Sequence, residues 1–498
     1  MSRFFAGSVL LCACMVELSW VSSARATEVE GEQSGVWSAE HNPYLMTGDV
    51  VVPPGGILAI TPGVVVRALG HYRIIVQEAT LLAVGSPNAP ITMTADDVLT
   101  GWRGILLQGA TDDSTVSHTI ITYSKGTGDA MEVGGGAIKI RDCAPTISYN
   151  VFRFNSSHNQ NFNGTGGAVC ARLSSASIVN NMMFQNSADS GGAIYAGDWG
   201  SPLISGNIVV GNSAELKGGG INIGARSTAL VEHNIVIGNR CDSSVNGGGG
   251  ITSWTGFGLF GTFAVYRNNL VAFNTAATAG GGMYLRYDRG IITNNLIAFN
   301  FAPSGGGIHA INFPSSAPIL SNNVIWGNTA TIEGPQIDLN ENTGSEIDVT
   351  YSIVQGGWPG VGNIDADPMF IAIPNPGPDG QWGTDDDDLG NLRVLPDSPA
   401  IGAGDPFLTD DPGETDLDGH ARVLCDFIDM GPYEFGIGDY NCDQTVDLDD
   451  YAFFTQCLTG PNGGPLEPGC APFDFNADGA IDLRDAAGFQ RAFMEFTP

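Results

Sequence analysis

Two acidic loops near the carboxyl end carry the clearest chemical signal in this sequence. The first begins at Asp439 and the second at Asp474, 35 residues later. In each loop oxygen-bearing residues stand at positions 1, 3, 5, 9 and 12, and position 7 offers a backbone carbonyl. A hard cation with six to eight oxygen ligands needs this spacing. The predicted calcium ligands are Asp439, Asn441, Asp443, Thr445, Asp447 and Asp450 in one loop, and Asp474, Asn476, Asp478, Ala480, Asp482 and Asp485 in the other.

A short helix is predicted after each loop, with Phe454 and Phe489 four residues past the last ligand. A loop, one exiting helix and a linker, repeated after 35 residues, resembles a dockerin module over residues 438–496. The resemblance implies calcium as the cofactor and a cohesin-like or cell-envelope protein as the partner. Dockerins choose partners at loop positions 10 and 11, which are Leu448-Asp449 and Leu483-Arg484 here.

The module departs from that pattern at two places. Gln444 replaces the glycine expected at position 6, where the backbone turns sharply, so the first site is predicted to be strained or weaker. The linker is rich in proline and glycine and is bracketed by Cys457 and Cys470, which we predict to form a disulfide. Seven cysteines follow residue 26, so at least one is predicted to stay free or to pair between chains.

A longer repeat fills the middle of the chain. Two asparagines five residues apart, with an apolar residue after the first, occur seven times: Asn150/Asn155, Asn181/Asn186, Asn207/Asn212, Asn234/Asn239, Asn269/Asn274, Asn295/Asn300 and Asn323/Asn328. Glycine clusters closed by an apolar residue recur in step, ending at Ile138, Val169, Ile194, Ile221, Ile251, Met283 and Ile308. Self-similarity at this period predicts a solenoid, in which each unit buries its core against its neighbours.

Each unit is interpreted as two strands and their corners. Apolar residues alternate with polar ones in segments such as Ile221-Asn-Ile223, and the frequent glycines argue against helices. One coil per repeat predicts a parallel β-helix, right-handed by the crossover rule, with a rise of roughly 4.8 Å per coil. The asparagines are predicted to stack in ladders, each donating its side-chain amide to the next coil, and to supply the left-handed corner conformation.

Residues 42–357 resemble right-handed parallel β-helix repeat proteins. That family includes lyases, glycosidases, adhesins and proteins without an assigned activity, so the resemblance implies a fold and leaves the function open. We therefore expect an all-β chain, a right-handed parallel β-helix solenoid, followed by a small α-helical calcium-loop domain.

After the repeats the chain reads Asp365-Ala-Asp-Pro-Met-Phe370, then Leu392-Arg-Val-Leu-Pro396, then Ile428-Asp-Met-Gly-Pro432. This series resembles the choice-of-anchor segments that close bacterial surface β-helices. Its acidic run Asp385–Asp388 has two interpretations, a solvated loop or a further calcium site. The predicted division is a signal peptide at 1–26, the β-helix at 27–364, a cap at 365–437 and the dockerin-like domain at 438–498.

The amino-terminal and bulk properties indicate export. Arg3, an apolar stretch and Ala24-Arg25-Ala26 form a signal-peptide pattern, with Cys14 as the acceptor in the alternative of lipoprotein processing. We expect a secreted, extracellular or surface-attached protein that does not span a membrane. The net charge of −33 argues against nucleic-acid binding, which needs a basic footprint.

One face of the predicted solenoid is the candidate polysaccharide surface. Residues next to the glycine clusters form two outward columns that contain aromatic rings for sugars and arginines for carboxylates. The predicted contacts are Arg141, Arg172, Tyr195, Trp254, Tyr284 and His309.

Catalysis has a weaker signal than binding. In a lyase, Lys139 or Arg286 would be the base that abstracts a proton. In a glycoside hydrolase, Asp198 and Asp288 lie three coils apart, roughly 14 Å, which exceeds the separation of an acid/base pair. The leading interpretation is a surface protein that contacts polysaccharide and attaches through its calcium module. The alternatives are a polysaccharide lyase or glycoside hydrolase, and a structural adhesin.

Overall fold

The computed structural model describes residues 26–126, 134–159, 164–245, 247–255, 261–312, 317–340, 343–408, 414–423, 427–436, 438–439, 446–460, 466, 470, 473–476 and 478–495. They form two compact units. One comprises residues 26–405 with 430–432, and the other comprises the described parts of 406–429 and 433–495. The predicted signal peptide lies, up to residue 25, outside the described residues.

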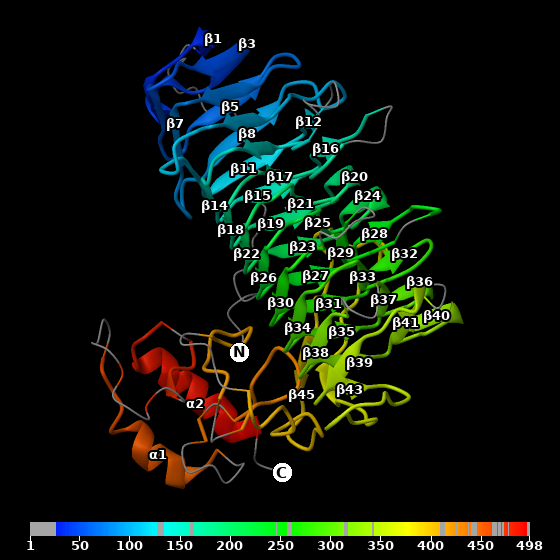
Figure 1. The fold of residues 1–498 in the computed structure, drawn as a ribbon. Helices are drawn as coiled ribbons and strands as arrows, with labels where there is room; N and C mark the ends of the chain where they lie inside the picture. Colours follow the sequence, from blue (N-terminus) through cyan, green and yellow to red (C-terminus); the bar gives the residue numbers. More distant parts are fainter. Residues whose placement is uncertain are drawn as a thin grey trace. The chain divides into compact units, whose positions relative to one another are not determined.

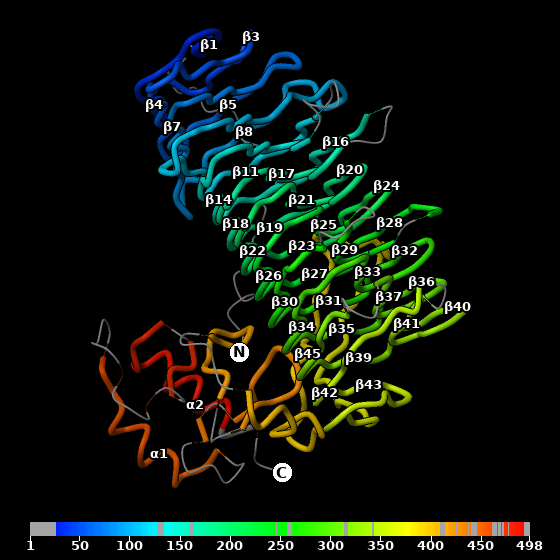
Figure 2. The backbone as a smooth tube through the Cα atoms, viewed as in Figure 1, coloured from blue at the N-terminus to red at the C-terminus, as the bar shows by residue number. Residues whose placement is uncertain are grey.

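The larger unit is a right-handed parallel β-solenoid, as the repeat predicts (Figure 1). Its coils run from β1 (Thr27–Glu32) to β43 (Ile353–Val354), and the backbone trace winds through them in regular turns (Figure 2). A complete coil contains four short strands, for example β21 (Ile194–Gly197), β22 (Leu203–Ser205), β23 (Ile208–Val210) and β24 (Ser213–Lys217). The expectation of two strands per coil was wrong because the first asparagine of each pair ends one strand before the next begins.

Two sheets contain one strand from each coil that they cover. The 12-stranded sheet consists of β2 (Gly35–Trp37), β4 (Ile57–Ile60), β7 (Thr80–Val84), β10 (Thr115–Ser117), β14 (Thr146–Ser148), β18 (Ser177–Val179), β22, β26 (Leu230–Glu232), β30 (Val265–Arg267), β34 (Ile291–Thr293), β38 (Ile319–Ser321) and β42 (Asp348–Thr350). The 8-stranded sheet consists of β12 (Lys125–Gly126), β16 (Ser156–Ser157), β20 (Ser187–Ser190), β24, β28 (Arg240–Cys241), β32 (Thr275–Ala276), β36 (Phe301–Ser304) and β40 (Thr329–Glu333).

The 23-stranded sheet combines two ladders. The strands after the glycine clusters are β13 (Ile138–Arg141), β17 (Val169–Arg172), β21, β25 (Ile221–Ile223), β29 (Ile251–Trp254), β33 (Met283–Arg286), β37 (Ile308–Ile311) and β41 (Ile337–Leu339). The strands between paired asparagines are β15 (Val151–Arg153), β19 (Met182–Phe184), β23, β27 (Ile235–Ile237), β31 (Leu270–Ala272), β35 (Leu296–Ala298) and β39 (Val324–Trp326). The remaining members are β1, β3 (Tyr44–Val52), β5 (Val65–Ala68), β6 (Ile74–Gln77), β8 (Ile91–Ala95), β9 (Ile105–Gln108), β11 (Thr119–Thr122) and β43. A short 3₁₀ helix, Ala39–His41, interrupts the first coil.

The asparagine pairs form two buried ladders along the solenoid, as predicted. Asn212 is typical: its Nδ2 donates to Oδ1 of Asn239 at 2.9 Å and to the backbone oxygen of Met183 at 2.9 Å. Its Oδ1 accepts from the backbone and side-chain amides of Asn186 at 2.9 and 3.0 Å. Each amide therefore joins three successive coils and leaves few polar atoms unpaired inside the core.

The left-handed corner conformation belongs to the residue before each ladder asparagine. Phe154, His233 and Phe273 have φ of 59°, 54° and 56°, and the asparagines that follow them do not have positive φ. The prediction that the asparagines themselves supply this conformation was therefore wrong. The preceding residue turns outward, and the turn directs the asparagine side chain into the core.

Residues 365–405 lie against the side of the solenoid. They contain an antiparallel pair, β44 (Phe370–Ala372) and β45 (Asn391–Val394). Trp382 covers Gly238, where an added Cβ would come within 2.0 Å of the indole ring. Arg153 pairs with Asp385 at 3.1 Å. Part of the acidic run therefore fastens this segment to the coils.

The smaller unit contains two helices, α1 (Leu448–Phe454) and α2 (Leu483–Glu495). Its core includes the predicted Phe454 and Phe489, whose rings are 5.2 Å apart. Cys457 and Cys470 form the predicted disulfide. Cys143, Cys170 and Cys241 are free and buried.

Candidate functional site

The second acidic loop is folded around its own carboxylates. Asp474 accepts from the backbone N–H groups of Asp478 at 3.1 Å and Gly479 at 2.8 Å, and Asn476 accepts from Asp478 at 2.9 Å. Gly479 has φ +77°, the left-handed conformation that position 6 of such a loop requires. These bonds hold oxygen atoms from positions 1, 3 and 5 on one tight turn.

Positions 9 and 12 of this loop begin the following helix. Asp482 accepts from the N–H of Arg484 at 2.7 Å, and Asp485 Oδ2 accepts from the N–H of Asp482 at 2.8 Å, which is a capping box. Asp485 is fully buried, and among the described residues its Oδ1 has no hydrogen-bond partner. Burial raises the pKa of Asp485, and the negative charges of Asp474 and Asp478 act in the same direction. An isolated buried carboxylate oxygen is costly, so it requires a cation or a proton.

The first loop repeats the same helix start. The Asp447 side chain caps α1 by accepting from the N–H of Asp449. In turn, Asp450 Oδ2 accepts from the N–H of Asp447 at 2.9 Å. Asp450 is fully buried and Asp439 is 4% exposed. Asn441, Asp443 and Thr445 lie outside the described residues. The two loops therefore share a buried aspartate at position 1 and the same helix-starting pair of aspartates at positions 9 and 12.

On the solenoid, the strand register places the predicted columns as expected. Cys170, Tyr195, Asn222, Thr252, Tyr284 and His309 follow one another through successive rungs. Most of this first column is covered: Tyr284 is 3% exposed and His309 is 7% exposed.

The glycine turn before each of these strands covers the side chains of the first column. A Cβ on Gly248 would meet Thr252 Oγ1 at 1.7 Å, and a Cβ on Gly305 would meet His309 Cβ at 2.7 Å. Each glycine cluster thus folds back over the side chain four residues later. Tyr195 is covered to a similar degree, and burial raises its pKa above the usual range. His309 Nδ1 lies 2.6 Å from Asp338 Oδ2, and the His309 ring stacks on Tyr284.

The second column is half-exposed. Two of its arginines are paired with acids, Arg141 with Asp142 at 3.2 Å and Arg172 with Asp198 at 2.7 Å. Further along the face, Trp254 and Arg286 face one another on neighbouring rungs. The guanidinium carbon of Arg286 is 5.4 Å from the indole centroid.

The structure adds Lys217 to this face. It ends β24, and its Nζ is 3.3 Å from the centroid of the Trp254 ring. Burial, together with the smaller effect of the positive charge of Arg286, lowers the pKa of Lys217 to about 8. The sequence pattern did not indicate Lys217, because this residue lies outside the strands that form the two columns. The one available signal was its rarity, since the chain has only three lysines.

The proposed catalytic residues are not brought together. Lys139 is 7% exposed and lines a narrow pocket with Arg73 and Arg103, on a different part of the solenoid from Arg286. Asp288 is buried, and Asp198 is paired with Arg172. The two aspartates therefore do not form an acid/base pair.

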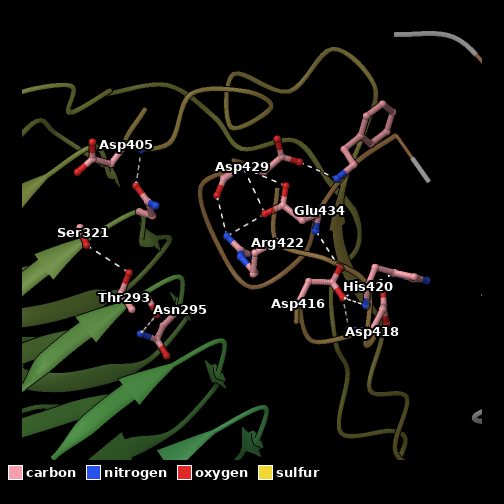
Figure 3. A network of polar contacts seen from close by, with 12 residues as sticks. Thr293, Asn295, Ser321, Asp405, Asp416, Asp418, His420, Arg422, Asp429 and Glu434 are labelled. Atoms are coloured by element: carbon pink, nitrogen blue, oxygen red, sulfur yellow. Dashed lines mark hydrogen bonds and ion pairs between the residues drawn. The ribbon is translucent and has the colours of Figure 1, made fainter. Parts of the chain in front are cut away.

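A buried polar network supports the smaller unit (Figure 3). Asp416 accepts from the N–H groups of Asp418 and His420 through Oδ1, and from that of Glu434 through Oδ2. Glu434 pairs with Arg422 at 2.9 Å, and both side chains are 1% exposed. Every carboxylate oxygen of Asp416 is thus used by the fold. Another acidic group, His158, Asp189 and Glu215, lies on the solenoid.

No known protein-family model matches this chain, and no curated protein sequence does. Across the described part of the chain, every helix is too short or too polar to cross a membrane.

Proposed function

We propose that this chain is a calcium-dependent attachment protein of the cell exterior. In this proposal the smaller unit binds calcium and docks on a protein partner, and the β-solenoid contacts polysaccharide. The observation that carries the proposal is the fully buried carboxylate of Asp485, at the last predicted ligand position of a duplicated loop, with one oxygen that has no hydrogen-bond partner among the described residues.

The residues present fit a calcium ion. Asp474, Asn476, Asp478, the carbonyl of Ala480, Asp482 and Asp485 would hold it in the second loop, and the capping box would orient the last two. The ion would neutralise acids that otherwise repel one another. The first loop would use Asp439, Asn441, Asp443, Thr445, Asp447 and Asp450 in the same way.

The docking surface we propose lies at the starts of the two helices. Leu448 and Leu483 occupy position 10 of their loops and are 70% and 88% exposed. Large apolar side chains with this exposure at equivalent positions favour contact with a protein partner. Resemblance to dockerins makes a cohesin-like or cell-envelope protein the proposed partner.

Calorimetric titration of the intact protein with calcium tests the metal sites. We expect uptake of two ions by the wild type and of one by Asp485→Asn. Asp449→Asn is the matched control because Asp449 has the same charge but stands at position 11, outside the ligand set. The proposal falls if the wild type takes up no calcium, or if Asp449→Asn and Asp485→Asn lose it equally.

A polysaccharide lyase is the second candidate function, and one observation favours it. Lys217 has a pKa near 8, so part of it is a free amine that can accept a proton at neutral pH. Release of unsaturated sugars, followed by ultraviolet absorbance, tests this candidate. Loss of that activity in Lys217→Met but not in Lys139→Met would assign the base.

A further inference from the structure

Lys217 and Arg286 form an unusual pair of cations. The chain has 20 lysines and arginines against 53 acids, so an acid partner is available to almost any cation. Arg141, Arg172 and Arg153 each have one. Within the described residues, neither Lys217 nor Arg286 forms an ion pair with a carboxylate.

The two cations converge from different coils on the ring of Trp254. Lys217 Nζ lies 3.3 Å and Arg286 Cζ lies 5.4 Å from its centroid. The indole face attracts both cations, but it does not cancel their charge. Their mutual repulsion, in partly desolvated positions, is left uncompensated by the fold.

The ring that both cations face is accessible to a ligand. Trp254 is half-exposed at the end of β29, and Arg286 lies beside it on the next rung. Two cations that lack an acid partner among the described residues favour an anion, and a half-exposed indole favours contact with a sugar ring. Together they indicate an anionic sugar as the ligand.

We propose that Lys217, Trp254 and Arg286 form a binding subsite for the carboxylate of a uronic-acid residue in an acidic polysaccharide. The carboxylate would lie between the two cations, and the sugar ring would contact the indole. This inference rests on the proposed contact between the solenoid and polysaccharide, and it names the substrate class. Since the whole chain is acidic, the contact should be weak and sensitive to salt.

Isothermal titration calorimetry of the full chain separates the possibilities. The probes are an oligogalacturonate and its fully methyl-esterified, neutral counterpart, at low ionic strength. We expect binding of the acidic probe, at least tenfold weaker binding of the ester, and at least tenfold loss of acidic binding in Lys217→Met and in Arg286→Gln. Arg67→Gln is the matched control, because Arg67 lies on β5, outside the predicted contact columns, and is already paired with Asp96.

Each other outcome has a defined meaning. Equal binding of both probes would overturn the carboxylate subsite and leave the polysaccharide contact standing. Binding of neither would overturn the polysaccharide contact and the subsite together, while the calcium sites would be untouched. Acidic binding that survives both Lys217→Met and Arg286→Gln would overturn the assignment of these residues. Near-ultraviolet circular dichroism verifies that the variants are folded.

Discussion

Asp288 shows how a single residue can be chemically conspicuous and still be structural. It is 1% exposed, its Oδ2 accepts from Tyr266 Oη at 3.1 Å and its Oδ1 accepts from the N–H of Gly290 at 2.7 Å. Burial raises the pKa of Asp288 to about 6. The carboxyl group therefore fastens a corner of the solenoid and faces no substrate.

The pKa of Asp288 predicts a pH-dependent stability. The unfolded chain loses this proton near pH 3.8 and the folded chain near pH 6, so Asp288 lowers the free energy of unfolding as pH rises between these values. The total is about 3 kcal/mol. Relative to wild type, Asp288→Asn should gain about that much between pH 4 and pH 7 in urea unfolding. Parallel curves for the two proteins would contradict this, and Asp198→Asn is the half-exposed control.

The lowered pKa of Lys217 predicts that the affinity for a uronate depends on pH. Its pKa is about 8, and the groups that face it are Arg286, which stays charged, and Cys241, whose pKa burial raises to about 11. Lys217 therefore loses its charge as pH rises from 7 to 9, while a uronate stays ionised. We expect roughly a tenfold fall in uronate affinity over this range, measured by calorimetry. Lys217→Met should abolish the pH dependence; a fall that persists in this variant would exclude Lys217 as its source.

The asparagine ladders are the elements that hold the coils in register. Each amide bonds to the coils on both sides, so one replacement leaves several buried groups unpaired. A ladder therefore transmits the position of each coil to the next.

Asn212→Ala should lower the free energy of unfolding of the solenoid by about 3–5 kcal/mol, because it strands the amides of Asn186 and the carbonyl of Met183. Urea denaturation measures this change. Asn222→Ala is the matched control, since Asn222 is equally buried but its Oδ1 has no partner among the described residues. Similar losses in both variants would show that volume, and not the ladder, accounts for the effect.

The disulfide is the corresponding element of the smaller unit. Cys457 and Cys470 are 13 residues apart and belong to the core around Phe454 and Phe489. Closing a loop of this size stabilises by about 3 kcal/mol. Replacing both cysteines by serine should lower the thermal midpoint of this unit, followed by calorimetry. Serine at the free, buried Cys143 should leave that midpoint unchanged, and a fall there would contradict the division into two units.

At the scale of the whole molecule, two separate apolar cores predict how the protein unfolds. The solenoid has an apolar core that runs along its coils, and the smaller unit has its own. We expect two calorimetric transitions, of which calcium raises only the one that Asp485→Asn alters. Calcium at 100 times its dissociation constant should stabilise that unit by about 2.7 kcal/mol per site. A calcium shift confined to the solenoid transition would contradict the assignment.

Much of this fold could be predicted because repetition makes it redundant. The asparagine pairs and glycine clusters recur together, 26 to 35 residues apart, so the register of the coils and the ladders follow from any few of them. The four-strand coil could not be predicted because residues 204–210 have the pattern of one strand, whereas the structure divides them at Gly206 and Asn207 into β22 and β23. The disulfide was predictable from the short loop that it brackets.

The candidate site was predicted unevenly for a related reason. Oxygen ligands within 12 consecutive residues are held close by the chain itself, so the second acidic loop was visible in its spacing. The exposed residues of the solenoid face could not be predicted in this way, because Gly248 and the equivalent glycines of other coils fold back over the side chains of the first column.

The sequence by itself determined the repeat unit of the solenoid, the stacking of its asparagines and the oxygen spacing of the acidic loops, since each depends on neighbours along the chain or on a motif that every unit repeats. Only the tertiary structure decided which columns are covered and which cations meet. Lys217 and Trp254 are far apart in sequence, and the turns between rungs vary in length. Their 3.3 Å contact is therefore set by the path of the backbone through successive coils, which no local pattern records.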